Sequence, residues 1–199
     1  DKGEELRLNA EKDFPIVAYV PCKSPDQIAA IDFRSITHVH FAFINPDSLG
    51  NFAYNACLDS IVKVAHAQGV RVLASIGGGS APAYYSTLLQ EGKRQRLVNR
   101  IAQLAMDYNL DGIDVDLEGS RIDANYEKFV IELRSALRPA HKLLTAAIAT
   151  FYKDQFTDNA LAQFDYMTLM SYDKTGPWKP GVRDNTLLTT WPFPTSTIG

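Results

Sequence analysis

The chain has 199 residues, of which 46% are hydrophobic and 22% charged, and its formal net charge is −3. This apolar content, with 10 Phe, 9 Tyr and 2 Trp, excludes a disordered chain. No apolar run approaches the ~20 residues that a membrane-spanning helix needs, and no basic cluster favours nucleic acid. These features leave open catalysis on, or binding of, an uncharged small or polymeric ligand.

Short apolar runs alternate with segments of helical periodicity along the chain. The runs that predict strands are 16–20, 37–44, 70–76, 112–118, 143–150 and 166–172. Helices are predicted between them, over 24–31, 55–68, 93–108 and 122–138, and more weakly over 154–163. Strands that are apolar on both faces and alternate with helices indicate a parallel α/β architecture.

Two parallel-sheet folds compete for this pattern. An open doubly wound sheet usually carries a Gly-rich phosphate turn after its first strand, whereas this chain has Pro21-Cys22-Lys23-Ser24 there. Polar residues recur instead at the carboxyl ends of strands, as in a (β/α)₈ barrel. The stretch after Asp173 is too short for two more units. We therefore predict an α/β fold of the TIM-barrel type with only about six β/α units, strands seven and eight being absent. Its two free sheet edges would allow self-association.

Three carboxylates alternate along the predicted strand 112–118. Asp114, Asp116 and Glu118 share one face of it, with successive side chains ~7 Å apart. Inside a barrel, like charges at this spacing raise at least one pKa. A glutamic acid with a raised pKa at the end of a strand is what a general acid requires. A divalent cation held by the three carboxylates is the alternative.

The segment Asp111-Gly112-Ile113-Asp114-Val115-Asp116-Leu117-Glu118 resembles the DxxDxDxE signature of family 18 glycoside hydrolases, the chitinases and endo-β-N-acetylglucosaminidases. Ser75-Ile76-Gly77-Gly78 matches the SxGG motif of that family, and Met170-Ser171-Tyr172-Asp173 matches its MxYD motif, in the same order. Tyr19 and Phe41-Ala42-Phe43 fit its aromatic positions. The similarity covers about residues 14–180, which we expect to form an incomplete catalytic barrel between a polar extension (1–13) and an irregular tail (181–199).

The resemblance implies retaining, substrate-assisted hydrolysis of β-1,4-linked N-acetylglucosamine (GlcNAc) in chitin or chitooligosaccharides, with no metal or cofactor. Glu118 would protonate the glycosidic oxygen while the 2-acetamido oxygen of the substrate attacks the anomeric carbon. Asp116 would bind the acetamido N–H, and Asp114 would hold the proton balance of the pair. Tyr172 would donate to the acetamido oxygen and Asp173 would position the sugar ring. The implied substrate-binding residues are Tyr19, Phe41, Ser75, Gly77, Gly78, Met170 and Trp178.

Several alternatives stay open beside this interpretation. The substrate could be the chitobiose core of N-glycans, or the chain could be a chitinase-like lectin, although that class usually loses the terminal acid and Glu118 is present. Trp178 could equally cap the barrel. Export to a secreted, periplasmic or cell-surface location is expected from the resemblance alone, since no signal peptide is visible.

The remaining candidate residues have simpler explanations. The glycines after Ser75 could form a phosphate loop, but the lysine of such a loop is missing, so close backbone packing is favoured. His38 and His40 alternate on one strand face without a third metal ligand, which favours packed, hydrogen-bonded histidines. Cys22 and Cys57 have no metal-ligand spacing and do not make a disulfide framework, so we expect two partly buried free thiols.

Overall fold

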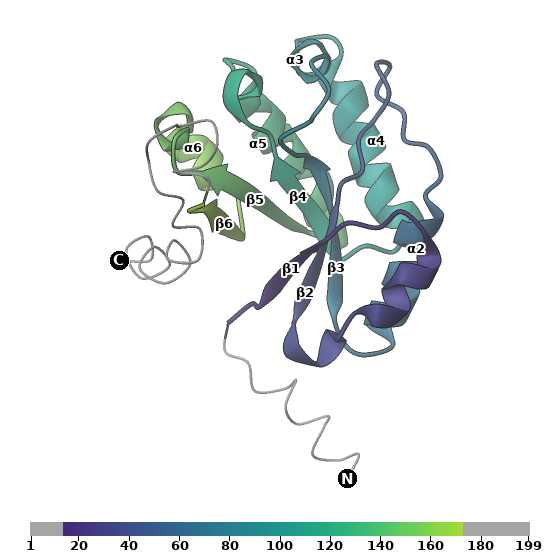
Figure 1. The fold of residues 1–199 in the computed structure, drawn as a ribbon. Helices are drawn as coiled ribbons and strands as arrows, with labels where there is room; N and C mark the ends of the chain where they lie inside the picture. The colour runs from purple at the N-terminus through teal and green to yellow at the C-terminus, as the bar shows by residue number, and fades with distance from the viewer. Residues whose placement is uncertain (1–13, 173–199) are drawn as a thin grey trace, which may run out of the picture.

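The structure, a computed structural model, describes residues 14–172. Six parallel strands form one curled sheet in chain order (Figure 1). They are β1 (Val17–Val20), β2 (His38–Ala42), β3 (Arg71–Gly77), β4 (Gly112–Asp116), β5 (Leu143–Ala149) and β6 (Tyr166–Met170). The six predicted strands and the parallel α/β fold are confirmed, as a half-barrel with β1 and β6 at its edges.

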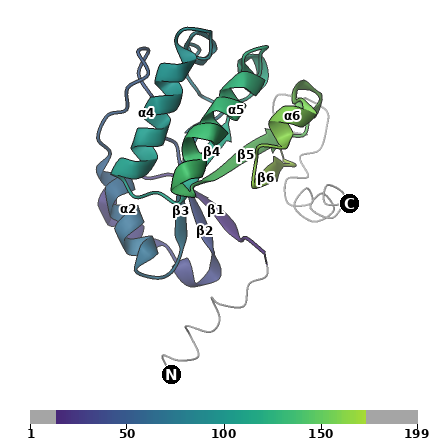
Figure 2. The ribbon, with the colours of Figure 1, turned by 180° about the vertical axis from the view of Figure 1, so that it is seen from behind.

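Helices cover the outer, convex face of the sheet (Figures 1 and 2). The α-helices are α2 (Ala56–His66), α3 (Tyr85–Leu88), α4 (Arg94–Asp107), α5 (Tyr126–Leu137) and α6 (Asp158–Leu161). Short 3₁₀ helices are η1 (Pro25–Ala30), η2 (Phe33–Ser35), η3 (Gly119–Arg121), η4 (Arg138–Ala140) and η5 (Lys153–Gln155). Within the described residues, none of the helices has the length and apolar character needed to cross a membrane.

Two predicted helices differ from the observed ones for local reasons. The segment after Ser24 forms the 3₁₀ helix η1, and the Ser24 side chain does not cap it. The segment 154–163 is divided into η5 and α6, because Thr157 begins a new helix by accepting a hydrogen bond from the Ala160 N–H at 3.2 Å. The four-residue helix α3 is too short to show a periodic pattern in the sequence.

Strand alternation separates an apolar outer face of the sheet from a polar inner face. In β4 and directly after it, Ile113, Val115 and Leu117 are buried in the core beneath the helices. Asp114 and Asp116 alternate with them and are 0% and 4% exposed. These two carboxylates therefore occupy the interior of the half-barrel.

Hydrogen bonds across the interior link strands that are not neighbours in the sheet. The Tyr19 hydroxyl on β1 lies 2.8 Å from the Thr168 hydroxyl on β6. His40 Nε2 on β2 lies 3.0 Å from the Tyr166 hydroxyl, also on β6. His38 bonds the Thr37 hydroxyl through Nδ1, so both histidines are packed and hydrogen-bonded, as expected. These contacts hold the curl of the sheet, whose edge strands β1 and β6 do not pair with each other in the part of the chain that the structure describes.

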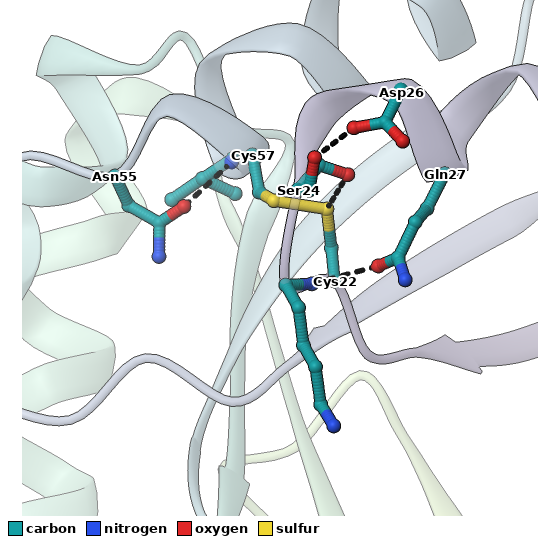
Figure 3. The surroundings of a disulfide bond; sticks show 8 residues. Cys22, Ser24, Asp26, Gln27, Asn55 and Cys57 are labelled. Atoms are coloured by element: carbon teal, nitrogen blue, oxygen red, sulfur yellow. Dashed lines mark hydrogen bonds between the residues drawn. A yellow bond between two sulfur atoms is a disulfide. The ribbon is translucent and has the colours of Figure 1, made fainter.

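Cys22 and Cys57 form a disulfide, so the expectation of two free thiols is wrong (Figure 3). Cys22 lies in the loop that leaves the edge strand β1, and Cys57 is the second residue of α2. The fold brings their Cα atoms to 6.0 Å although 35 positions separate them in the chain. This contact depends on how α2 packs against the loop, which cysteine spacing does not reveal.

We expect the double variant Cys22→Ser/Cys57→Ser to be about 3 kcal/mol less stable than the parent, because the cross-link removes loop-closure entropy from the unfolded chain. Urea denaturation of the two proteins at one pH measures the difference. The parent in dithiothreitol is the matched control and should unfold at the same urea concentration as the variant. Equal stability of variant and oxidised parent would contradict the prediction.

Candidate active site

Asp114 lies at the centre of the barrel interior, surrounded by polar groups from four other strands. Its Oδ2 accepts hydrogen bonds from the hydroxyls of Tyr19, at 3.0 Å, and Ser75, at 2.7 Å. Its Oδ1 accepts one from the Thr145 hydroxyl at 2.6 Å and lies 3.4 Å from His40 Nδ1. Both carboxylate oxygens are thus occupied by protein groups. Within the described chain, no three His, Cys, Asp or Glu side chains are grouped to hold a metal ion.

The environments of Asp114 and Asp116 move their pKa values in opposite directions. Burial would raise the pKa of Asp114, but His40 and the hydroxyls of Thr145 and Ser75 outweigh it and hold this pKa below its ordinary value. Burial, followed by the negative charges of Glu118 and Asp114, raises the pKa of Asp116 to about 7. Asp116 Oδ1 is buried with no hydrogen-bond partner among the described residues. The ionised carboxylate of Asp114 therefore lies behind Asp116, whose carboxyl group is able to hold a proton near neutral pH.

Glu118 lies just beyond the end of β4, half-buried, where extended backbone leads into η3. A Cβ atom placed on Gly79 would be 3.7 Å from Glu118 Oε1, so this carboxyl group lies over the loop that follows β3. Arg121 in η3 donates to the carbonyl oxygens of Ala81 and Pro82 in the same loop. The ends of β3 and β4 are thereby joined around the glutamate.

The glycines after Ser75 allow the backbone of β3 to approach β4. A Cβ atom on Gly77 would lie 2.1 Å from the Asp116 carbonyl oxygen, and one on Gly78 would lie 2.6 Å from the Phe43 ring. Asn45 fixes this turn: its side chain accepts from the Gly77 N–H at 2.8 Å and donates to the Gly77 carbonyl at 3.0 Å. The glycines of the Ser75–Gly78 motif therefore position Asp116 by close packing of the backbone. This agrees with the prediction from sequence, which favoured close packing over a phosphate loop.

A pocket of about 330 Å³ opens beside Asp116 at the carboxyl ends of the strands. The residues that line it are Tyr19, Pro21, Ala42, Phe43, Asp116, Ala147, Met170 and Tyr172. It brings together Tyr19 and Met170, two of the predicted substrate-binding residues, with Tyr172, the predicted donor to the acetamido oxygen, and with Asp116. Such a pocket, apolar with a few polar groups, is typical of a ligand site.

The prediction that Phe41 binds the substrate is wrong. Its side chain is 1% exposed and belongs to the core under the helices. Because neighbouring residues of a strand face opposite sides, the inward position of His40 turns Phe41 outward. Phe43, beyond the end of β2, lines the pocket instead. Asp173 and Trp178 lie outside the described residues.

Sequence comparison assigns the family of the chain. The profile described as Glycosyl hydrolases family 18 matches residues 15–197. The chain belongs to this family. A family 18 chitinase from Flavobacterium johnsoniae has a similar structure, with a TM-score of 0.79 and 34% identity over 86% of this chain. A family 18 chitinase from Cycas revoluta, solved in complex with (GlcNAc)3, shares the fold with a TM-score of 0.73 at 24% identity over 83% of this chain.

Curated relatives are more distant in sequence. A chitinase-like effector of Moniliophthora roreri is 26% identical over 84% of this chain, and chitinase B of Serratia marcescens is 23% identical over 83%. The chain spans 47% and 38% of these two relatives, and 58% of the Flavobacterium johnsoniae and 57% of the Cycas revoluta structures. It thus corresponds to about half of a family 18 barrel.

Sequence reasoning missed several residues that position the family motifs. Asn45, Arg121 and Thr145 belong to no recognised motif, and His40 was assigned only to packing. Asn45 lies two positions after Phe43 and directly follows the predicted apolar strand 37–44. A polar residue at the end of an apolar strand is the signal that could have identified it. Arg121 carries no such signal, because its contact with the β3 loop is made only in the folded chain.

Proposed function

We propose that this family 18 chain supplies the catalytic acid and acetamido-binding groups for hydrolysis of β-1,4-linked GlcNAc in chitin or chitooligosaccharides. The observation that carries the proposal is the pairing of Glu118, at the strand end, with a buried Asp116 whose pKa is raised to about 7. Behind Glu118, the environments of Asp114 and Asp116 move their pKa values in opposite directions, as is typical of sites for acid–base catalysis. The chitinase names of the relatives support the choice of substrate.

In the proposed mechanism, Glu118 donates its proton to the glycosidic oxygen as the bond to the anomeric carbon breaks. The carbonyl oxygen of the substrate's own 2-acetamido group attacks that carbon and forms an oxazolinium ion. Asp116 accepts a hydrogen bond from the acetamido N–H and stabilises the positive charge, while Asp114 stays ionised behind it. Water then opens the ring, with Glu118 taking up the proton, so that the anomeric configuration is retained.

The residues around the pocket have supporting roles in this proposal. The Tyr172 hydroxyl donates to the acetamido oxygen, and Asp173 positions the sugar ring. Tyr19, Phe43 and Met170 provide the apolar wall against which the sugar packs. Ser75, Gly77 and Gly78 were predicted to bind the substrate, but in this proposal they position the carboxylates instead. Ser75 is fully buried and donates to Asp114, and the backbone at Gly77 and Gly78 lies against Asp116. Trp178 remains a proposed sugar contact.

The test is release of fluorophore from 4-methylumbelliferyl chitobioside by the 199-residue chain. Glu118→Gln keeps the size of the side chain but provides no acid, so we expect turnover to fall about 1000-fold. Glu91→Gln, the same change at an exposed position before α4, is the matched control and should keep the parent rate.

Other outcomes of this assay separate the alternatives. Absence of turnover with retained binding of (GlcNAc)4 would overturn the catalytic proposal and favour a chitinase-like lectin. Turnover that EDTA abolishes would support the divalent-cation interpretation of the carboxylates instead. Cleavage of an N-glycan core in preference to chitotetraose would assign the chain to the endo-β-N-acetylglucosaminidase branch.

We further propose that the protein is secreted and that its chains associate through the free sheet edges. The Cys22–Cys57 disulfide suits an oxidising compartment, and a relative from Penicillium expansum is named a secreted chitinase. On the outer face of the edge strand β6, Met167 and Leu169 are each 41% exposed. Sedimentation velocity at several concentrations tests the association, and a concentration-independent monomer would contradict it.

A further inference from the structure

A second surface hollow lies away from the pocket at Asp116. The loop 51–55, which precedes α2, packs against the second half of α4 and leaves a hollow of about 550 Å³. The residues around it are Asn51, Phe52, Ala53, Tyr54, Asp59, Arg100, Gln103, Leu104, Asp107 and Tyr108, none of which lines the other pocket. α2 and α4 lie on the opposite side of the half-barrel from β6 (Figure 1). This surface is therefore remote from β6.

Tyr54 presents a fixed aromatic ring at the edge of this hollow. Its side chain is 74% exposed, yet its ring stacks on that of Tyr108, with 6.2 Å between centroids and 19° between planes. The Tyr108 hydroxyl accepts a hydrogen bond from the Asn55 N–H at 2.7 Å, and Asn55 in turn caps α2 through the Leu58 N–H. An exposed ring that is already positioned loses little conformational entropy when a ligand stacks on it.

Planar polar side chains continue from this ring along α4. Arg96, Arg100, Gln103 and Asp107 are all exposed and, at spacings of three and four residues, follow one face of the helix. A neighbouring hollow of about 450 Å³ shares Arg100 and Gln103 with the hollow of about 550 Å³ beside Tyr54. From Arg96 to Asp107 the helix advances by eleven residue steps, or about 16 Å. The two hollows thus form one track, which we call the α4 track, long enough for about three sugar units.

The chemistry of the α4 track suits an uncharged polysaccharide. A β-linked sugar has an apolar C–H face that stacks on an aromatic ring, and a rim of hydroxyl and acetamido groups. Guanidinium and amide groups donate to that rim, while carboxylate and amide oxygens accept from it. Both signs of charge are present along the track, so neither a polyanion nor a polycation matches it. We propose that Tyr54, Tyr108 and the α4 track form a second binding surface for a GlcNAc polymer. The choice of this polymer rests on the proposed function.

The experiment measures binding of the 199-residue chain to chitin beads, together with turnover of 4-methylumbelliferyl chitobioside. We expect Tyr54→Ala to weaken bead binding about 5- to 10-fold, because the stacking ring is lost, and to leave turnover of this short substrate unchanged. Tyr54→Phe keeps the ring and should bind like the parent. Met106→Ala removes an exposed apolar side chain from α4 outside the track and is the matched control.

Each result bears separately on the surface and on the pocket at Asp116. Weaker bead binding of Tyr54→Ala supports the surface even if no turnover is found, in which case only the catalytic proposal fails. Unchanged bead binding of Tyr54→Ala overturns the surface even if turnover is normal. Bead binding that 0.5 M NaCl abolishes equally in parent and Tyr54→Ala also overturns it, because charge attraction would then account for the binding.

Discussion

Gly77→Ala lowers the free energy of unfolding by at least about 4 kcal/mol, or prevents folding, although it adds a single methyl group. The new Cβ atom would lie 2.1 Å from the Asp116 carbonyl oxygen and 2.6 Å from its carbonyl carbon, which are backbone atoms of the neighbouring strand. Gly77 also has a φ of +106°, a conformation that costs an alanine about 1–3 kcal/mol. Urea denaturation followed by circular dichroism measures the loss.

Two neighbouring glycines provide graded controls for this variant. Gly78→Ala contacts the movable ring of Phe43, but φ is +85°, so we expect an intermediate loss of about 1–3 kcal/mol. At Gly79 a Cβ atom meets only Glu118 Oε1, at the ordinary contact distance of 3.7 Å, so Gly79→Ala should change stability by less than about 1 kcal/mol. Equal stabilities of the three variants would show that backbone approach at Gly77 is unimportant.

Asp116→Asn stabilises the folded protein by up to about 4 kcal/mol at pH 7.5 and has no such effect at pH 4. Burial and the charge of Glu118 raise the pKa of Asp116 to about 7, from an ordinary value of 3.8. Between pH 4 and pH 7 the unfolded chain therefore loses this proton while the folded chain keeps it, and the stability of the parent falls as pH rises. Asparagine does not ionise, so the advantage of the variant grows over that window and is constant above pH 7.

Urea denaturation of parent and variant at each unit from pH 4 to pH 8 measures this advantage. Asp154→Asn is the matched control, because Asp154 is exposed and pairs with the neighbouring exposed Lys153, so its effect should be small at every pH. A pH-independent difference between Asp116→Asn and the parent would show that Asp116 ionises alike in both states. Where turnover is measurable, the same variant should lose about 100- to 1000-fold in rate, since the amide cannot stabilise the developing positive charge.

Prediction from sequence succeeded for features that depend on local pattern. Apolar runs of strand length separated by helical segments predicted all six strands and their parallel order. Strand alternation placed Asp114 and Asp116 on one face of the same strand. Prediction was weaker where a segment is short or is tied down by distant contacts, as in η1, which lies beside the Cys22–Cys57 disulfide.

The sequence by itself determined the half-barrel, the order of its strands and the row of carboxylates. Each of these features depends on a local pattern, formed by residues that are adjacent in the chain or that alternate along one strand. Only the tertiary structure decided that Cys22 meets Cys57, that Phe43 rather than Phe41 reaches the pocket, and that Asp114 and Asp116 differ in pKa. β2 carries bulky residues on both faces, so its pattern does not show which face turns inward. The two aspartates differ because three other strands supply hydroxyl donors to Asp114 and His40 Nδ1 lies 3.4 Å from it, whereas Asp116 Oδ1 is buried without a donor among the described residues.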